Sequence, residues 1–206
     1  MKKMLILMVL LLSGCSSLLT NHFVYDDNCP RLCWLGINPG ITTVKEAQEL
    51  VNSSSAIDKN RLQFSDKSIL TDWFTGRPRA FPSTVNIEFE GELVKSISFG
   101  QLPYKMDEVI DLLGQPDEIS IRLVLVPDAE YIEYFVYYHS SKTLVHVLPG
   151  TQNGPDPVDT VSGLFLNSEF NQDILPTGSG TIQPWIGYGH LKDYIPEMQT
   201  PSTTIP

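Results

Sequence analysis

Two ten-residue segments of the sequence follow one pattern of apolar and polar residues. Residues 43–52 (TVKEAQELVN) align with residues 105–114 (KMDEVIDLLG). In both, apolar residues recur at intervals of three and four, which is typical of a short amphipathic helix. Thr43 and Glu46 predict a capping box at the start of the first helix, whereas the second segment has Lys105 in place of the threonine. Each segment ends in Asn or Gly, which readily adopt the conformation that ends a helix, so we expect two helices of about ten residues.

Runs of β-branched and aromatic residues follow each predicted helix. After the first helix, residues 84–90 and 93–99 alternate apolar and polar side chains around Gly91, which predicts a hairpin. After the second helix, three further runs predict a β-meander; these are residues 119–126, 131–138 and 143–148. We therefore predict an α+β fold with two tandem repeats of a short helix followed by an antiparallel β-meander.

The doubled pattern resembles two known families. The helix end at Gly114 and Pro116 after Glu108 and Val109, followed by strands, is similar to the small envelope lipoproteins of the SmpA/OmlA or BamE-like group. The doubled helix-and-meander unit resembles the β-lactamase inhibitor proteins. The resemblance covers residues 36–148 and implies a protein that acts by protein contact, either supporting outer-membrane assembly or filling the cleft of another protein. Lys105 departs from the capping threonine usual in those families, and no inhibitory loop can be matched.

The N-terminus has the features of an export signal. A basic start precedes the nine apolar residues 4–12, which are too few for a span of ~20 residues. Leu12-Ser13-Gly14-Cys15 then resembles the lipobox of bacterial lipoproteins, which implies cleavage before Cys15 and attachment of a diacylglycerol and acyl chains such as palmitate to that residue. The alternative is an ordinary secretory signal with a cysteine there by chance. We expect a protein held by lipid at a cell membrane, or at the outer membrane because Ser16 rather than Asp follows, and exposed outside the cytoplasm.

Two cysteines remain for the folded part of the chain. Cys29 and Cys33 are four positions apart, and outside the cytosol thiols tend to be oxidised. A turn at Pro30 can bring them within disulfide range, which predicts a small loop that pins the start of the domain. The alternative is a metal site with His22, but zinc prefers four ligands and no second Cys or His pair follows.

The predicted organisation divides the chain into six parts. They are residues 1–14, a lipoprotein signal peptide; 15–33, a tether with the disulfide loop; 34–100 and 101–148, the two repeats; 149–195, an irregular C-terminal extension rich in Pro, Gly, Asn and Asp; and 196–206, a disordered tail. Within the extension, residues 163–166 are expected to add an edge strand.

Charge narrows the classes of partner. The formal net charge is −10 at pH 7, and removal of the signal peptide with its two lysines makes it more negative. Nucleic acid and anionic lipid surfaces repel such a protein, so we expect no nucleic-acid partner. A 42% hydrophobic composition is ordinary for a globular chain that buries a core.

Catalytic signatures are sparse. No Gly-x-Ser-x-Gly elbow, phosphate-binding glycine loop or haem attachment motif occurs, and we expect no cofactor. Asp156 and Asp159 offer too few oxygens for a calcium loop, since calcium takes six to eight. Hairpin pairing would bring His139 near His146, which leaves a metal or acid–base site conceivable.

An aromatic cluster near the C-terminus offers a possible binding surface. Trp185, Tyr188 and His190 lie among glycines, and their rings can stack on a ligand or cover the sheet. We expect a lipid-anchored, non-enzymatic envelope protein that binds or scaffolds another envelope protein. The alternative is an envelope hydrolase or metal-dependent enzyme with a site near His139 and His146 or within residues 185–190.

Overall fold

A computed structural model describes most of the chain. It covers residues 23–26, 29–74, 83–126, 129–149, 154–169 and 182–194. The predicted signal peptide, Cys15, His22 and the predicted tail lie outside the described residues.

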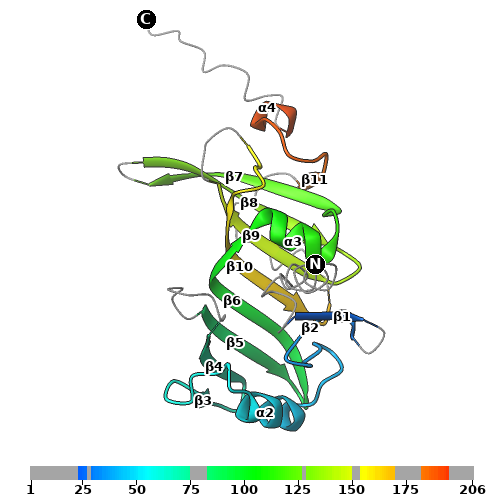
Figure 1. Ribbon diagram of the computed structural model, residues 1–206, viewed down its shortest axis with the longest axis vertical. Coiled ribbons are helices and arrows are strands. Elements are labelled where there is room, and N and C mark those ends of the chain that lie inside the picture. Colours follow the sequence, from blue (N-terminus) through cyan, green and yellow to red (C-terminus); the bar gives the residue numbers. More distant parts are fainter. Residues whose placement is uncertain are drawn as a thin grey trace, which may run out of the picture.

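The protein is dominated by one antiparallel sheet of nine strands (Figure 1). The strands follow the order β11-β7-β8-β9-β10-β6-β5-β4-β3 across the sheet. Their bounds are β3 Gln63–Phe64, β4 Ser68–Trp73, β5 Ser83–Glu90, β6 Leu93–Lys105, β7 Glu118–Val126, β8 Ala129–Tyr138, β9 Thr143–Leu148, β10 Thr160–Asn167 and β11 Ile182–Pro184. A separate two-stranded hairpin joins β1 (Phe23–Asp26) to β2 (Cys29–Trp34).

The predicted fold class is therefore wrong. The strands do not form two meanders under two helices, because β10 pairs with β9 on one side and with β6 on the other and makes one sheet of them all. Leu164 of β10 faces Val145 of β9 and Phe99 of β6 across the ladder. The C-terminal part thus supplies an interior strand, where an edge strand in an irregular extension was predicted. Helices are a minor component of the described structure.

The helices cover one side of the sheet. Helix α2 (Val44–Ser53) begins with the predicted capping box, since the Glu46 amide donates to Thr43 Oγ1 over 3.3 Å and the Thr43 amide donates to Glu46 Oε2 over 2.9 Å. Helix α3 (Met106–Leu113) begins after Lys105, whose ammonium cannot accept a hydrogen bond. A short third helix, α4, spans Leu191–Tyr194.

The loop of residues 154–159 completes the start of α3. The Met106 amide donates to the Asp159 carbonyl over 3.0 Å, and the Asp107 amide donates to the Pro157 carbonyl over 3.1 Å. These backbone acceptors satisfy amides that a helix start otherwise leaves unpaired. Loop 154–159 is therefore fixed against α3.

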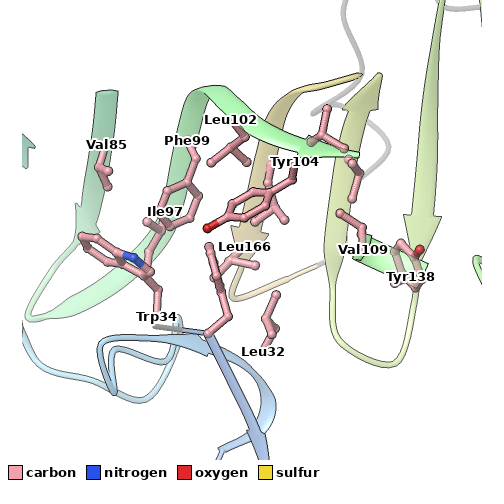
Figure 2. Packing of buried hydrophobic residues seen from close by; sticks show 14 of the residues in the cluster. Leu32, Trp34, Val85, Ile97, Phe99, Leu102, Tyr104, Val109, Tyr138 and Leu166 are labelled. Atoms are coloured by element: carbon pink, nitrogen blue, oxygen red, sulfur yellow. The ribbon is translucent and has the colours of Figure 1, made fainter. Parts of the chain in front are cut away.

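The main core lies between the sheet and the elements that cover it. Figure 2 shows Val85, Ile97 and Phe99 from β5 and β6 facing Trp34 from β2. Rings in this region meet edge to face, with centroids of Trp34 and Phe99 5.2 Å apart and those of Trp34 and Trp73 5.9 Å apart. Buried aromatic area of this kind dominates the stability of a core.

The predicted disulfide is confirmed. Cys29 and Cys33 are bonded, with their Cα atoms 5.8 Å apart. Both cysteines are buried, as are the neighbouring Leu32 and Trp34. The disulfide links two residues of β2, the strand that places Trp34 in the core. It therefore holds the start of the domain in place.

A second, smaller apolar cluster lies on the opposite face of the sheet. Strand side chains alternate between faces. Tyr134, Val136 and Tyr138 of β8 enter the main core, whereas Phe135 and Tyr137 pack with Leu144 and Phe165. Among the described residues, no helix has the length and apolar character of a membrane span.

Candidate functional site

A row of polar side chains crosses four neighbouring strands on the second face of the sheet. Arg122 of β7, Glu133 of β8, His146 of β9 and Ser162 of β10 form this cross-strand polar row. Arg122 forms an ion pair with Glu133. The other Glu133 carboxylate oxygen lies 2.8 Å from His146 Nε2, and His146 Nδ1 lies 2.9 Å from Ser162 Oγ. Each strand therefore contributes one member of a continuous network.

The pairing register of the strands explains why these four side chains lie next to one another. Arg122 and Glu133 are directly paired across β7 and β8, and Gly163 is paired with His146 across β10 and β9. The ladder of β10 shifts between Val161 and Gly163, and a bulge of this kind re-aims the side chain it contains. Ser162 is that residue, so the bulge directs its hydroxyl to the histidine.

Burial and charge set the ionisation of the row. The Glu133 side chain is 5% exposed and the Arg122 side chain 23%. Phe135 stacks on the His146 ring with centroids 4.5 Å apart. Burial lowers the pKa of His146, and the nearby positive charge of the Arg122 guanidinium lowers it further. The imidazole is accordingly neutral at pH 7.

A neutral His146 can act as a hydrogen-bond relay. When His146 Nε2–H donates a hydrogen bond to Glu133, Nδ1 can accept a hydrogen bond from the Ser162 hydroxyl. This is the order of contacts in a serine–histidine–acid relay. The relay would also need amide donors for an oxyanion. Ser162 is the bulge residue between the paired Val161 and Gly163, and its hydroxyl is also 3.3 Å from the His146 carbonyl.

The structure does not bring His139 and His146 into one site. His139 follows β8, where its Nε2 lies 3.0 Å from Glu118 and its amide donates to Asp117 over 2.7 Å. His146 is paired with Phe135, four residues back along β8, which corresponds to about 13 Å at the usual rise of a strand. The two histidines have different carboxylate partners.

The second candidate region is the C-terminal aromatic segment, residues 185–194. Trp185 ties it to the turn after α3, because its amide donates to the Asp117 carbonyl over 3.1 Å and its Nε1 donates to Gln115 over 2.8 Å. Tyr194 is buried, donates its hydroxyl to the Gly187 carbonyl and accepts from the Ile186 amide over 3.3 Å. These contacts give the segment a defined shape.

The predicted binding residues of this segment differ in packing and in solvent exposure. Trp185 packs edge to face on Tyr188, with centroids 5.7 Å apart, and serves as an anchor. Tyr188 is 37% exposed and the neighbouring Ile186 is 63% exposed. His190 is exposed, and its amide donates to Asp193 over 3.1 Å. Ile186, Tyr188 and His190 are thus each exposed to solvent.

The possible metal ligands are engaged elsewhere. The Asp159 carboxylate accepts from the Tyr134 hydroxyl and from the Asp156 amide, each over 2.8 Å, and the Cys29 and Cys33 sulfurs form the disulfide. Within the described ranges, no three His, Cys, Asp or Glu side chains are arranged to hold a metal ion.

Sequence reasoning missed Arg122, Glu133 and Ser162. A signal was present, since Arg122 and Glu133 interrupt otherwise apolar strand runs at positions that face away from the main core. A charge in such a run indicates a polar partner on the neighbouring strand, because a buried lone charge is costly. The identity of that partner depends on strand order, which the runs do not contain.

Comparison of the chain with protein-family models, with curated proteins and with solved structures finds no match.

Proposed function

We propose that this protein is a lipid-anchored protein of a bacterial cell envelope that acts as a non-catalytic protein-binding module. Cys15 carries the lipid, and the C-terminal aromatic segment contacts the partner, another envelope protein. The observation that carries the binding role is the exposure of Ile186 and Tyr188 on a segment held by Trp185 and Tyr194. An exposed apolar pair costs little conformational entropy on binding when its backbone is already ordered.

Two further observations support the envelope location. The lipobox-like residues 12–15 follow a short apolar run, and several acyl chains hold a protein at a membrane far longer than one chain does. The disulfide between Cys29 and Cys33 is typical of a protein outside the reducing cytosol. Globomycin, which blocks the lipoprotein signal peptidase, should leave the precursor uncleaved.

The test is a cross-linked pull-down of the full-length protein from its own membranes. We expect an envelope protein to be recovered with the native chain and lost with Cys15→Ala, because the lipid sets the local concentration. Ile186→Ser/Tyr188→Ser should lose the same partner. The matched control, Ile41→Ser, changes a residue that is 57% exposed beside α2 and should keep it. Recovery of no partner with the native chain would contradict the proposal.

A hydrolase is the second candidate, because Ser162, His146 and Glu133 have the contacts of a relay. Its test is labelling of the native protein with a fluorophosphonate probe, followed by peptide mapping. A covalent adduct on Ser162 that is absent in Ser162→Ala and in heat-unfolded protein would favour the enzyme. Absence of that adduct would favour a structural role for the row.

A further inference from the structure

The hairpin of β7 and β8 extends beyond its neighbours in the sheet. β7 pairs with β8 along its whole length. Among the described residues, β11 covers the outer edge of β7 only from Glu118 to Ser120, and β9 pairs with β8 only from Tyr134 onward. The far half of the hairpin is therefore a two-stranded ribbon, which projects from the body of the protein at the upper left of Figure 1.

The backbone groups of alternate β7 residues point away from β8. In an antiparallel sheet, the N–H and C=O of one residue point to one neighbouring strand and those of the next residue point to the other. The odd-numbered positions face β11, because the amide of Trp185, directly after β11, donates over 3.1 Å to the carbonyl of Asp117, directly before β7. β7 has no register shift against β8, so the alternation continues along the strand. Leu123 and Leu125 therefore present their amides and carbonyls at an edge where no other described strand is paired.

This stretch of β7 lacks the protection that the opposite edge of the sheet has. Proteins protect edge strands by keeping them short or charged, or by covering them. At the opposite edge β3 has only two residues, and the preceding loop covers part of β4, since the Asp58 amide donates to the Asp72 carbonyl over 2.9 Å. In β7, the residues after Arg122 are Leu-Val-Leu-Val. An uncharged edge strand of this kind readily pairs with another strand.

The sequence of β7 is suited to antiparallel pairing with itself. The longest such pairing that leaves β11 in place sets Val124 opposite Val124 of a second copy and Leu123 opposite Leu125. The two leucines then form hydrogen-bonded pairs across the interface, as their outward amides and carbonyls require. Arg122 lies opposite an apolar residue, so no like charges meet. The pairing stops at Pro127, which has no amide, and does not reach the residues that β11 covers.

We infer that two copies of this chain associate through the outer edges of β7, residues 122–126, and join their sheets into one. This association goes beyond the proposed function and does not depend on it. The same edge is used by both copies, so the assembly closes at a dimer. The projecting ribbon gains a third strand on the open side of β7, which is favourable because two-stranded ribbons are only marginally stable in water.

The test measures association of the full-length protein in density-matched detergent by sedimentation equilibrium. We expect a monomer–dimer equilibrium for the native protein. Val124→Lys and Val124→Glu should each weaken the dimer about fivefold or more, because like charges then meet at a non-hydrogen-bonded pair, where side chains are closest. A mixture of these two variants should dimerise more tightly than either variant alone. The control Thr84→Lys makes the same change in charge at an exposed position of β5 and should leave the association within about twofold.

A native protein that is monomeric at all concentrations would overturn the inference, as would equal weakening by Thr84→Lys or no recovery in the mixture. Hydrogen exchange of the Leu123 and Leu125 amides gives an independent readout, because these amides should exchange slowly in the dimer and rapidly on dilution to the monomer. Slow exchange in the monomer would show that the edge is occupied within one chain and would contradict the inference. Protection of the same amides only when an envelope protein is added would assign the edge to that protein instead. A dimer that binds no envelope protein would refute the proposed function alone.

Discussion

Glu133 is the residue whose replacement should destabilise the protein most among the polar groups of the sheet. Its carboxylate is buried between the Arg122 guanidinium and the His146 ring, and its side chain is 5% exposed. Glu133→Leu removes the carboxylate that forms the ion pair with Arg122, whose side chain is 23% exposed, and also removes the group that His146 Nε2 contacts. Removal of one partner of a buried ion pair lowers the free energy of unfolding by about 3–5 kcal/mol.

The double variant Arg122→Leu/Glu133→Leu distinguishes the contribution of the ion pair to stability from that of side-chain packing. Replacement of both charges by apolar groups removes the cost of keeping them dehydrated, so this variant should recover most of the loss, with about 1–2 kcal/mol remaining because the half-buried His146 Nε2–H loses its acceptor. Equilibrium unfolding in urea, followed by the fluorescence of the buried Trp34 and Trp73, measures the three free energies. Glu88→Leu, at an exposed strand position, should change the value by less than about 0.5 kcal/mol. A single variant that costs under about 1 kcal/mol, or a double variant as unstable as the single, would refute the reasoning.

Three other predictions concern the fold. Thr43→Ala should lower the free energy of unfolding by about 1 kcal/mol through loss of the α2 cap, whereas Lys105→Ala should lose no cap, and urea unfolding that finds the two equal would contradict this. Cys29→Ser/Cys33→Ser should cost about 2 kcal/mol, as expected for a very short loop, and the variant should be insensitive to a reductant that destabilises the native protein; an equal response of both would contradict it. Folding lowers the pKa of His146 below its ordinary 6.5, so its stabilising contribution is present above that pH and is lost as the pH falls. The stability of His146→Asn should therefore fall less than that of the native protein between about pH 7.5 and 5, and parallel curves would show that another group is responsible.

Elements set by short-range patterns could be predicted. The capping box of Thr43 and Glu46 is specified within four residues, and α2 begins at that place. The hairpin of β5 and β6 turns at Gly91, where alternation on both sides and a residue suited to positive φ coincide. The disulfide follows from a spacing of four and a turn.

Strand order could not be predicted, because it depends on contacts between distant segments. The residues before β10 are rich in Pro, Gly and Asp, and Gly163 lies within the strand itself, so the sequence is typical of a loop leading to a weak edge. The Gly163 backbone instead packs between His146 and Phe99, where a Cβ atom would lie 3.3 Å from the Phe99 carbonyl oxygen. The glycine is what allows β10 to lie between β9 and β6.

The same distinction between local sequence patterns and long-range contacts applies to the candidate sites. Trp185, Tyr188 and His190 were predicted as a cluster because they are close in sequence. Ser162 and Glu133 reach His146 only through the pairing of β8, β9 and β10, which brings together segments that are separated along the chain. No local sequence pattern specifies those contacts.

The most direct test of the binding role is photo-cross-linking in the cells that make the protein. A benzophenone amino acid is placed at Ile186, and as a control at Leu70, which is 39% exposed on β4. The proposal predicts one cross-linked envelope protein from position 186, none of it from position 70, and loss of the adduct with Cys15→Ala. The same adducts from both positions, or none from position 186, would contradict it.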